Sequence, residues 1–165
     1  MFKPLLCMSM RAVCLAGTAI AADSLSNMLS VARIVSQSDG NEHSEPANSA
    51  KPGDVLEYTA LYRNAGAGAV RKLEVTLPIP EGTEYLAGQA HPAGAWASID
   101  GKTFAPQPLH RRVAKADGAM VDELVPLQEY RFLRWPPADL AAGASLECRA
   151  RVKITTRVTE SSTRP

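Results

Sequence analysis

Alternation of apolar and polar residues is the dominant pattern of the chain from Pro52 onward. In residues 54–63 (DVLEYTALYR), apolar side chains occupy every second position, and residues 73–77 and 145–158 repeat the pattern. Such alternation is typical of half-buried antiparallel strands. Shorter strands are expected at residues 30–35, 83–86, 96–99, 102–104 and 130–135, with Asp100-Gly101 predicting a tight hairpin between two of them.

Short strands separated by turn residues, with no window of helical period, predict an all-β fold. The spacing favours an immunoglobulin-like antiparallel β-sandwich of about seven or eight strands. Two segments fit this pattern less well. Residues 38–50 are polar and are expected to form an exposed connection, and Gln107–Val125 is expected to be a long crossover or an elaborated loop.

The first residues have the composition of a secretory signal peptide. Lys3 and Arg11 precede a short apolar run, which ends in Ala19-Ile20-Ala21. The alternative, a membrane anchor, needs about 20 apolar residues, and this run is shorter. We therefore expect a signal peptide at residues 1–21, a single domain at 22–158 and a polar tail at 159–165, with a periplasmic or extracellular location.

The chain has 3 cysteines, and removal of the leader would leave Cys148 alone. A single cysteine cannot close an internal disulfide, so the domain must be held together by its core. Cys148 could form an intermolecular disulfide or act as a reactive thiol. Its place among alternating apolar residues favours a small core side chain.

Composition and motifs argue against several classes of function. The 18 basic residues face 17 acidic ones, so there is no net positive field for a nucleic acid. His43, His91 and His110 lie in expected loops without the spacing of a metal site, and no nucleophile or phosphate-binding motif is present. We therefore expect no enzyme activity, no cofactor and no metal.

The most suggestive surface feature is a set of basic residues that could bind a partner. Alternate positions of the last strand carry basic side chains, the aromatic strand at 130–135 carries two more, and the long insertion carries a pair. If these two strands lie in the same sheet, the first two groups could form a positive stripe on that sheet, which could bind an anionic glycan, a lipid or an acidic protein. The alternative is an ordinary solvated face with ion pairs to Glu147 and Glu129. The candidates are Arg111, Arg112, Arg131, Arg134, Arg149, Arg151 and Lys153.

The run from Lys51 to Gly88 resembles the start of a bacterial surface repeat, the family called domain of unknown function 11. The early motifs are Pro52-Gly53-Asp54, Tyr58 with Asn64 and Gly66, and Pro80-Glu81-Gly82-Thr83; the late ones are Arg134-Trp135, Leu140-Ala141-Ala142-Gly143 and Ser145–Ile154. The resemblance covers roughly Met28 to Thr155 in a single copy. It departs from the family at Thr76, where an Asp is usual, and in the long middle insertion.

The resemblance implies an immunoglobulin-like fold in an exported envelope or surface protein that serves as an interaction or spacer module. On that basis, we expect a non-catalytic module that binds an envelope or surface protein through its loops or an edge strand. The alternative is a soluble binder of carbohydrate or an anionic ligand, using Trp96, Trp135 and nearby arginines. Aromatic residues are otherwise expected to pack in the core and against the sheets; these are Tyr58, Tyr62, Trp96, Phe132 and Trp135.

Overall fold

The computed structural model describes residues 25–155 and confirms the all-β prediction. The expected signal peptide and polar tail lie outside these residues. Two short 3-10 turns, η1 (Ala47–Ser49) and η2 (Leu127–Glu129), interrupt the strands. The strands are β1 (Leu25–Ser36), β2 (Glu42–Pro46), β3 (Val55–Asn64), β4 (Val70–Pro78), β5 (Thr83–His91), β6 (Trp96–Ser98), β7 (His110–Ala114), β8 (Met120–Leu124), β9 (Phe132–Leu140) and β10 (Ser145–Ile154).

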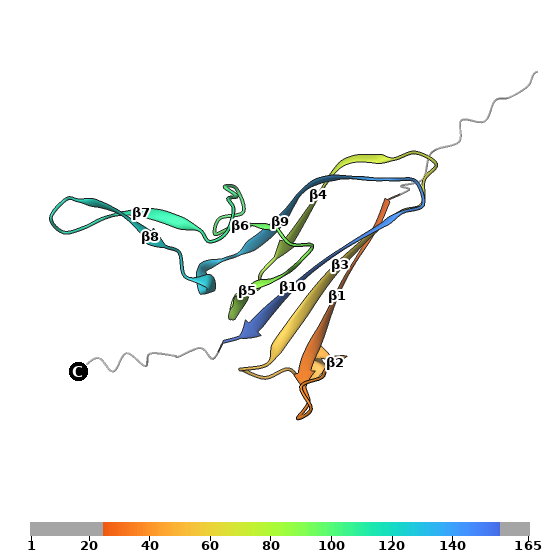
Figure 1. The fold of residues 1–165 in the computed structure, drawn as a ribbon, viewed down its shortest axis with the longest axis horizontal. Helices are drawn as coiled ribbons and strands as arrows, with labels where there is room; N and C mark the ends of the chain where they lie inside the picture. Colours follow the sequence, from red (N-terminus) through yellow and green to blue (C-terminus); the bar gives the residue numbers. More distant parts are fainter. Residues whose placement is uncertain (1–24, 156–165) are drawn as a thin grey trace, which may run out of the picture.

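The strands form two antiparallel sheets and one projecting hairpin (Figure 1). The larger sheet has five strands in the order β2-β1-β3-β10-β5, and the smaller has three in the order β4-β9-β6. The β7–β8 pair extends away from both sheets, at the left of the view. The chain crosses between the two sheets after β3, β4, β5 and β9, so that consecutive strands enclose one common core.

The fold has two antiparallel sheets, as immunoglobulin domains do, but the order of the strands within the sheets differs from theirs. With β2 and the β7–β8 hairpin set aside, seven strands remain. In an immunoglobulin constant domain the fifth strand lies between the second and the fourth, and the last strand lies at the edge of the other sheet. Here the last strand, β10, lies between β3 and β5, and β6 lies at the edge of the smaller sheet. The two strands have exchanged places.

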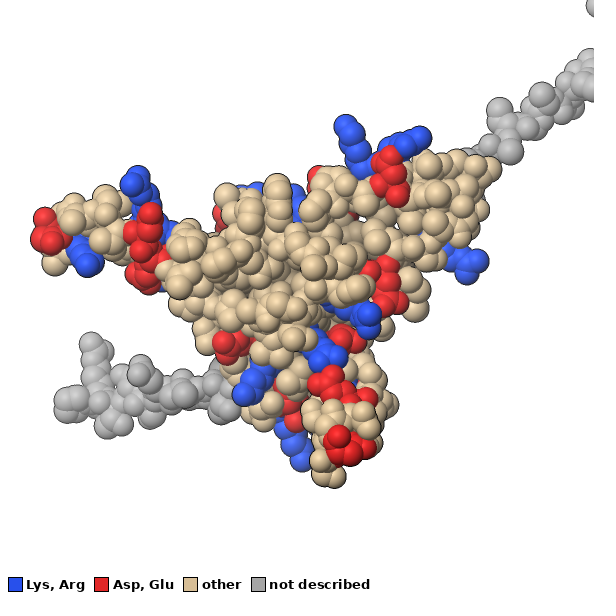
Figure 2. All heavy atoms as spheres, viewed as in Figure 1, with Lys and Arg blue, Asp and Glu red and all other residues tan. Residues whose placement is uncertain are grey.

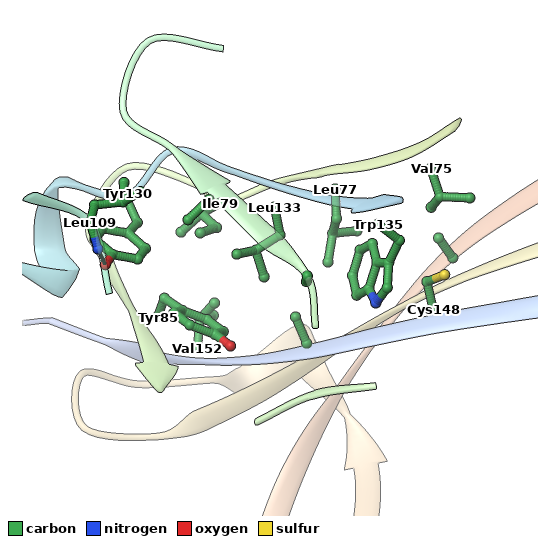
Figure 3. Packing of buried hydrophobic residues seen from close by; sticks show 14 of the residues in the cluster. Val75, Leu77, Ile79, Tyr85, Leu109, Tyr130, Leu133, Trp135, Cys148 and Val152 are labelled. Carbon is green, nitrogen blue, oxygen red and sulfur yellow. Dashed lines mark hydrogen bonds between the residues drawn. The ribbon is translucent and has the colours of Figure 1, made fainter. Parts of the chain in front are cut away.

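The core lies between the sheets and is built from the side chains that alternation places inward (Figure 3). From the smaller sheet come Val75 and Leu77 on β4, together with Leu133 on β9. The larger sheet contributes Tyr85 on β5 and Val152 on β10, both 1% exposed. Burial of large apolar side chains stabilises each by about 1.5–3 kcal/mol, so this cluster is the main favourable contribution to folding.

Aromatic side chains divide between core and surface in a way the sequence predicted only in part. Trp135 is buried, and its indole N–H donates to the Pro92 carbonyl oxygen at 2.7 Å. The prediction that Trp96 is a core residue is wrong, because its side chain remains 43% exposed at the edge strand β6. Tyr85 and Tyr130, which the sequence did not single out as core residues, are almost fully buried and stack with ring centroids 6.1 Å apart.

The Asp100-Gly101 turn exists, but the second strand of the expected hairpin does not. The Asp100 carboxylate accepts the backbone N–H groups of Lys102 and Thr103, both at 2.8 Å, and these bonds lower its pKa to about 2. Those N–H groups are therefore unavailable to a strand ladder. The chain pairs with β6 again only at Ala105, through a bridge to Ala97.

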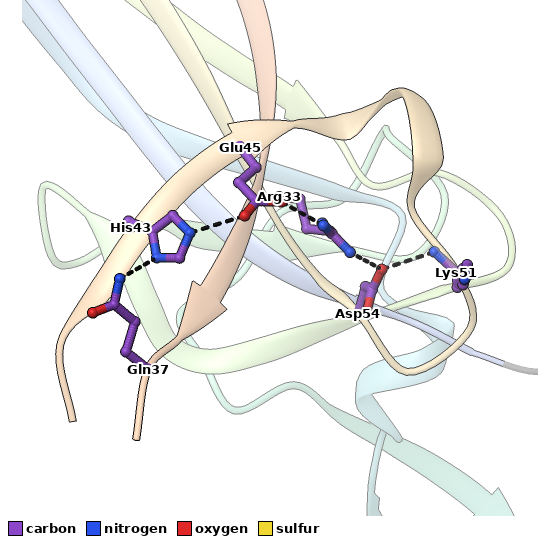
Figure 4. Close-up of polar contacts among 6 residues, drawn as sticks. All are labelled: Arg33, Gln37, His43, Glu45, Lys51 and Asp54. Atoms are coloured by element: carbon purple, nitrogen blue, oxygen red, sulfur yellow. Dashed lines mark hydrogen bonds and ion pairs between the residues drawn. The ribbon is translucent and has the colours of Figure 1, made fainter. Parts of the chain in front are cut away.

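Both segments that were expected to be irregular contain strands. Within residues 38–50, β2 pairs with the second half of β1, and ion pairs replace an apolar face (Figure 4). Arg33 pairs with Glu45 and, at 3.4 Å, with Asp54, and the Lys51 backbone N–H donates to Asp54 at 2.9 Å. The expected insertion folds as the β7–β8 hairpin, anchored at its base by the buried Leu109.

The buried amide of Asn64 joins two connections between the sheets. Its Nδ2 donates to the carbonyl oxygens of Gly68 at 2.8 Å and of Leu140 and Ala141 at 3.1 Å, and its Oδ1 accepts the Gly66 N–H at 3.0 Å. The side chain is 0% exposed. One amide therefore bonds backbone groups of both the loop after β3 and the turn after β9. Asn64 and Leu140 are 76 residues apart in sequence.

We predict that Asn64→Ala lowers the free energy of unfolding by about 2–4 kcal/mol, because several buried backbone groups lose their partner. Urea denaturation followed by circular dichroism measures the change. The control is Asn41→Ala: the Asn41 side chain is exposed and donates only to Asp39, so we expect a loss below about 0.5 kcal/mol. Equal stabilities of the two variants would contradict the prediction.

Candidate functional site

The basic residues singled out in the sequence lie in separate places rather than in one stripe. Arg149, Arg151 and Lys153 are on β10 in the larger sheet, whereas Arg134 is on β9 in the smaller one. Arg131 precedes β9, and the two remaining arginines are on β7. The expectation of one sheet carrying both of the first two groups is therefore wrong, because β9 and β10 belong to different sheets.

On β10, the arginines are paired with carboxylates, as the alternative interpretation expected. Arg151 bonds Glu57 on the neighbouring β3 at 2.9 Å and Glu42 on β2 at 2.8 Å, and the bonds to these carboxylates raise its pKa, with the bond to Glu57 the largest cause. Arg149 pairs with Glu147 at 3.0 Å. Lys153 is exposed and lies opposite Glu84 in the strand register. This face is thus a mixed ion-pair network rather than a positive surface.

The other candidate arginines also have local partners. Arg111 pairs with Glu129 at 2.6 Å and with Glu123 at 3.2 Å, which holds the β7–β8 hairpin to η2. Arg112 lies 3.6 Å from Asp122 across the hairpin. Arg131 donates to the carbonyl oxygens of Gln128 and Tyr130, at 2.6 and 3.0 Å. Figure 2 shows the same intermixing of blue and red side chains over the visible face.

Arg134 is at the centre of a hollow on the outer face of the smaller sheet. It lies in register between Thr76 and Trp96, donates to the Thr76 hydroxyl at 3.1 Å, and places its guanidinium 3.8 Å from the ring centroid of Phe104. The hollow has a volume of about 260 Å³ and is also lined by Glu74, Lys102, Trp135, Pro136 and Pro137. The structure therefore brings Trp96, Trp135 and an arginine together, although only Trp96 is exposed.

The first half of β1 is a free sheet edge. Its other side pairs with β3 from Leu25 to Ile34, whereas β2 covers only Ala32–Ser36. Leu25–Val31 therefore has no strand on its outer side among residues 25–155. We call this segment the β1 edge. Its sequence, LSNMLSV, contains no charged residue and no proline.

Apolar side chains of the β1 edge are exposed because the smaller sheet does not reach across β1. Leu29 lies opposite the buried Ala60, and Val31 lies opposite Tyr58, so both are on the core-facing side of the larger sheet. They nevertheless remain 56% and 41% exposed. Met28, on the other face, is 60% exposed. The sequence placed a strand only at residues 30–35, because the mixture of serine, asparagine and apolar residues in 25–29 does not alternate.

The structure assigns Cys148 to the core, as the sequence favoured. Cys148 is 0% exposed, lies opposite Ala60 in the register, and has its pKa raised to about 11 by burial and by the charge of Glu147. No group of three or more histidine, cysteine or acidic residues within 25–155 has the geometry of a metal site. In the same part of the chain, no helix is long and apolar enough to cross a membrane.

Comparisons with known proteins do not add to this geometry. No protein-family model, curated protein or solved structure matches the chain.

We predict that Cys148 does not react with a disulfide reagent in the folded protein at pH 8. With a pKa of about 11, about one thiol in a thousand is ionised at that pH, and burial also blocks access. The absorbance of the released thiol, recorded with and without urea, measures the reaction in a chain carrying Cys7→Ser and Cys14→Ser. Stoichiometric labelling without urea would contradict the assignment.

Proposed function

We propose that this chain is an exported, non-catalytic interaction module of the bacterial cell envelope, which binds a partner chain at the β1 edge. The observation that carries the proposal is the free, uncharged edge Leu25–Val31 with its exposed apolar side chains. Free backbone N–H and C=O groups along such an edge can accept one more strand from another chain, and side-chain contacts then give specificity.

Two features of the sequence support the location in this proposal. Residues 1–21 have the charge and apolar pattern of a signal peptide, which would bring the domain to the periplasm or the cell surface. The resemblance to the domain of unknown function 11 family points to the same compartment and to an interaction or spacer role. In the structure, Asn64 joins two of the motifs on which the resemblance rests, since it bonds residues of the late Leu140–Gly143 turn.

We predict that Leu29→Lys abolishes capture of an envelope partner, because it places a charge among the exposed apolar side chains of the edge, next to the side chains of an added strand. The matched control is Leu124→Lys on β8, since Leu29 and Leu124 are similarly exposed, at 56% and 58%. Tagged full-length chains are crosslinked in the envelope fraction, purified and examined by mass spectrometry, and urea denaturation checks that both variants fold. A partner lost with Leu124→Lys and kept with Leu29→Lys would contradict the proposal and indicate the hairpin instead.

The hollow around Arg134 supports a second candidate function, binding of an acidic carbohydrate. The exposed indole of Trp96 offers an apolar face on which a sugar ring can stack. Lys102 and Arg134 offer donors to a carboxylate, which would compete with Glu74, 3.7 Å from Arg134. The hollow is open and small, which suits one or two sugar units better than a protein surface.

We predict that, on this second candidate function, an oligosaccharide of uronic acids quenches the fluorescence of Trp96. The chain has 2 tryptophans, and because Trp135 is buried, the exposed Trp96 should carry most of the change. Arg134→Gln should weaken binding by about tenfold, because a charge-assisted hydrogen bond is lost. Trp96→Phe should remove the signal change, and a neutral oligosaccharide of equal length is the control. Equal quenching by neutral and acidic sugars would contradict the role of Arg134.

A further inference from the structure

The β1 edge has the geometry to pair with a copy of itself. The segment left free by β2 runs from Leu25 to Val31, and its midpoint is Met28. When two identical strands pair in antiparallel orientation, the arrangement is two-fold symmetric, so both free edges are satisfied at once. Building on the proposed function, we propose that the partner strand at this edge is the β1 edge of a second copy, with Met28 opposite Met28.

The extent of β2 selects this register. With Met28 at the centre, Leu25 lies opposite Val31 and Asn27 opposite Leu29, and all seven residues of each edge are paired. If the pairing were shifted toward the C-terminal end of β1, the partner strand would lie against Ala32, whose outer side is already paired with Pro46 of β2. A shift the other way leaves part of each edge unpaired. The centred register is therefore the longest that β2 allows.

The side chains of the edge suit a symmetric pair. Residues directly opposite in an antiparallel pair lie on the same face, so the exposed Leu29 and Val31 of one copy gain Asn27 and Leu25 of the other as neighbours. Because the segment has no charged residue, no like charges meet at the two-fold axis. The result joins the two five-stranded sheets into one continuous sheet, with β2 of each copy in line with the β1 edge of the other.

A single cysteine at the two-fold axis tests the register directly. Opposite residues in an antiparallel pair have Cα atoms about 4.5–5.5 Å apart, within the range for a disulfide. Met28→Cys is introduced into the full chain with Cys7→Ser and Cys14→Ser, where the buried Cys148 does not compete. The control is Met120→Cys on β8, because Met28 and Met120 are 60% and 55% exposed.

We expect Met28→Cys to form a covalent dimer at least about tenfold faster than Met120→Cys under mild oxidation, as seen on non-reducing gels, since pairing holds the two thiols at high effective concentration. Sedimentation should give twice the mass of one chain for the parent protein. Leu29→Lys should give a monomer, and Leu124→Lys should remain a dimer. Urea denaturation confirms that each variant is folded.

Three results would overturn the pairing of two copies. These are a monomer at every soluble concentration, equal crosslinking of the two cysteine variants, or a dimer that survives Leu29→Lys. If the protein is monomeric but Leu29→Lys still abolishes capture of an envelope protein, the edge binds a different chain, and the proposed function stands without the dimer. If neither self-association nor capture depends on Leu29, both proposals fail.

Discussion

The buried amide of Asn64 is the constraint that sets how the two sheets meet. The chain passes from one sheet to the other after β3 and after β9, and buried carbonyl groups of both crossings lie beside Asn64. Asn64 Nδ2 donates to three of these carbonyl groups, while the backbone of Asn64 bonds Ala144 and Gly143. The side chain thus joins the two crossings, and the backbone bonds of Asn64 hold the end of β3 beside the start of β10.

Once β3 and β10 are fixed at the centre of the larger sheet, the width of the smaller sheet decides what is buried. Three strands cover β3, β10 and β5 but leave β1 outside the core. Arg33 shows this limit, because it lies on the core-facing side opposite Leu56 and is accommodated by Glu45 and Asp54 rather than by apolar residues. The exposure of Leu29 on the same face has the same cause. The free β1 edge is therefore a consequence of unequal sheets.

Sequence alternation predicted the parts of the fold whose stability comes from one apolar face. β3 and β10, with Cys148 at their centre, follow that rule and were predicted well. β2 and the β7–β8 hairpin were missed because ion pairs such as Arg33–Glu45 and Arg111–Glu129, not apolar faces, hold them in place. Charged residues in a row carry no periodic signal that separates a strand from a loop, so a single sequence could not reveal these pairings.

The candidate site was predicted less well, because a site depends on which strands become neighbours. The alternation on β10 correctly placed Arg149 and Arg151 on one face, but only the fold shows that Glu57 lies beside them. Trp96 and Phe104 likewise lie next to Arg134 only in the folded chain, because the β7–β8 hairpin separates β6 from β9 in the sequence.

The distribution of charge then distinguishes the β1 edge from the rest of the larger sheet. Along β10, β3 and β2, basic and acidic side chains pair within and across the strands, so these charges do not form a positive surface for an anionic partner. Sheet edges in monomeric proteins usually carry charged residues or proline that prevent another strand from adding. In β1 the first charged residue is Arg33, which lies in the half already covered by β2. The uncovered half, Leu25–Val31, has no charged residue and no proline to prevent another strand from adding. This is the pattern expected of an edge that is paired when the protein functions.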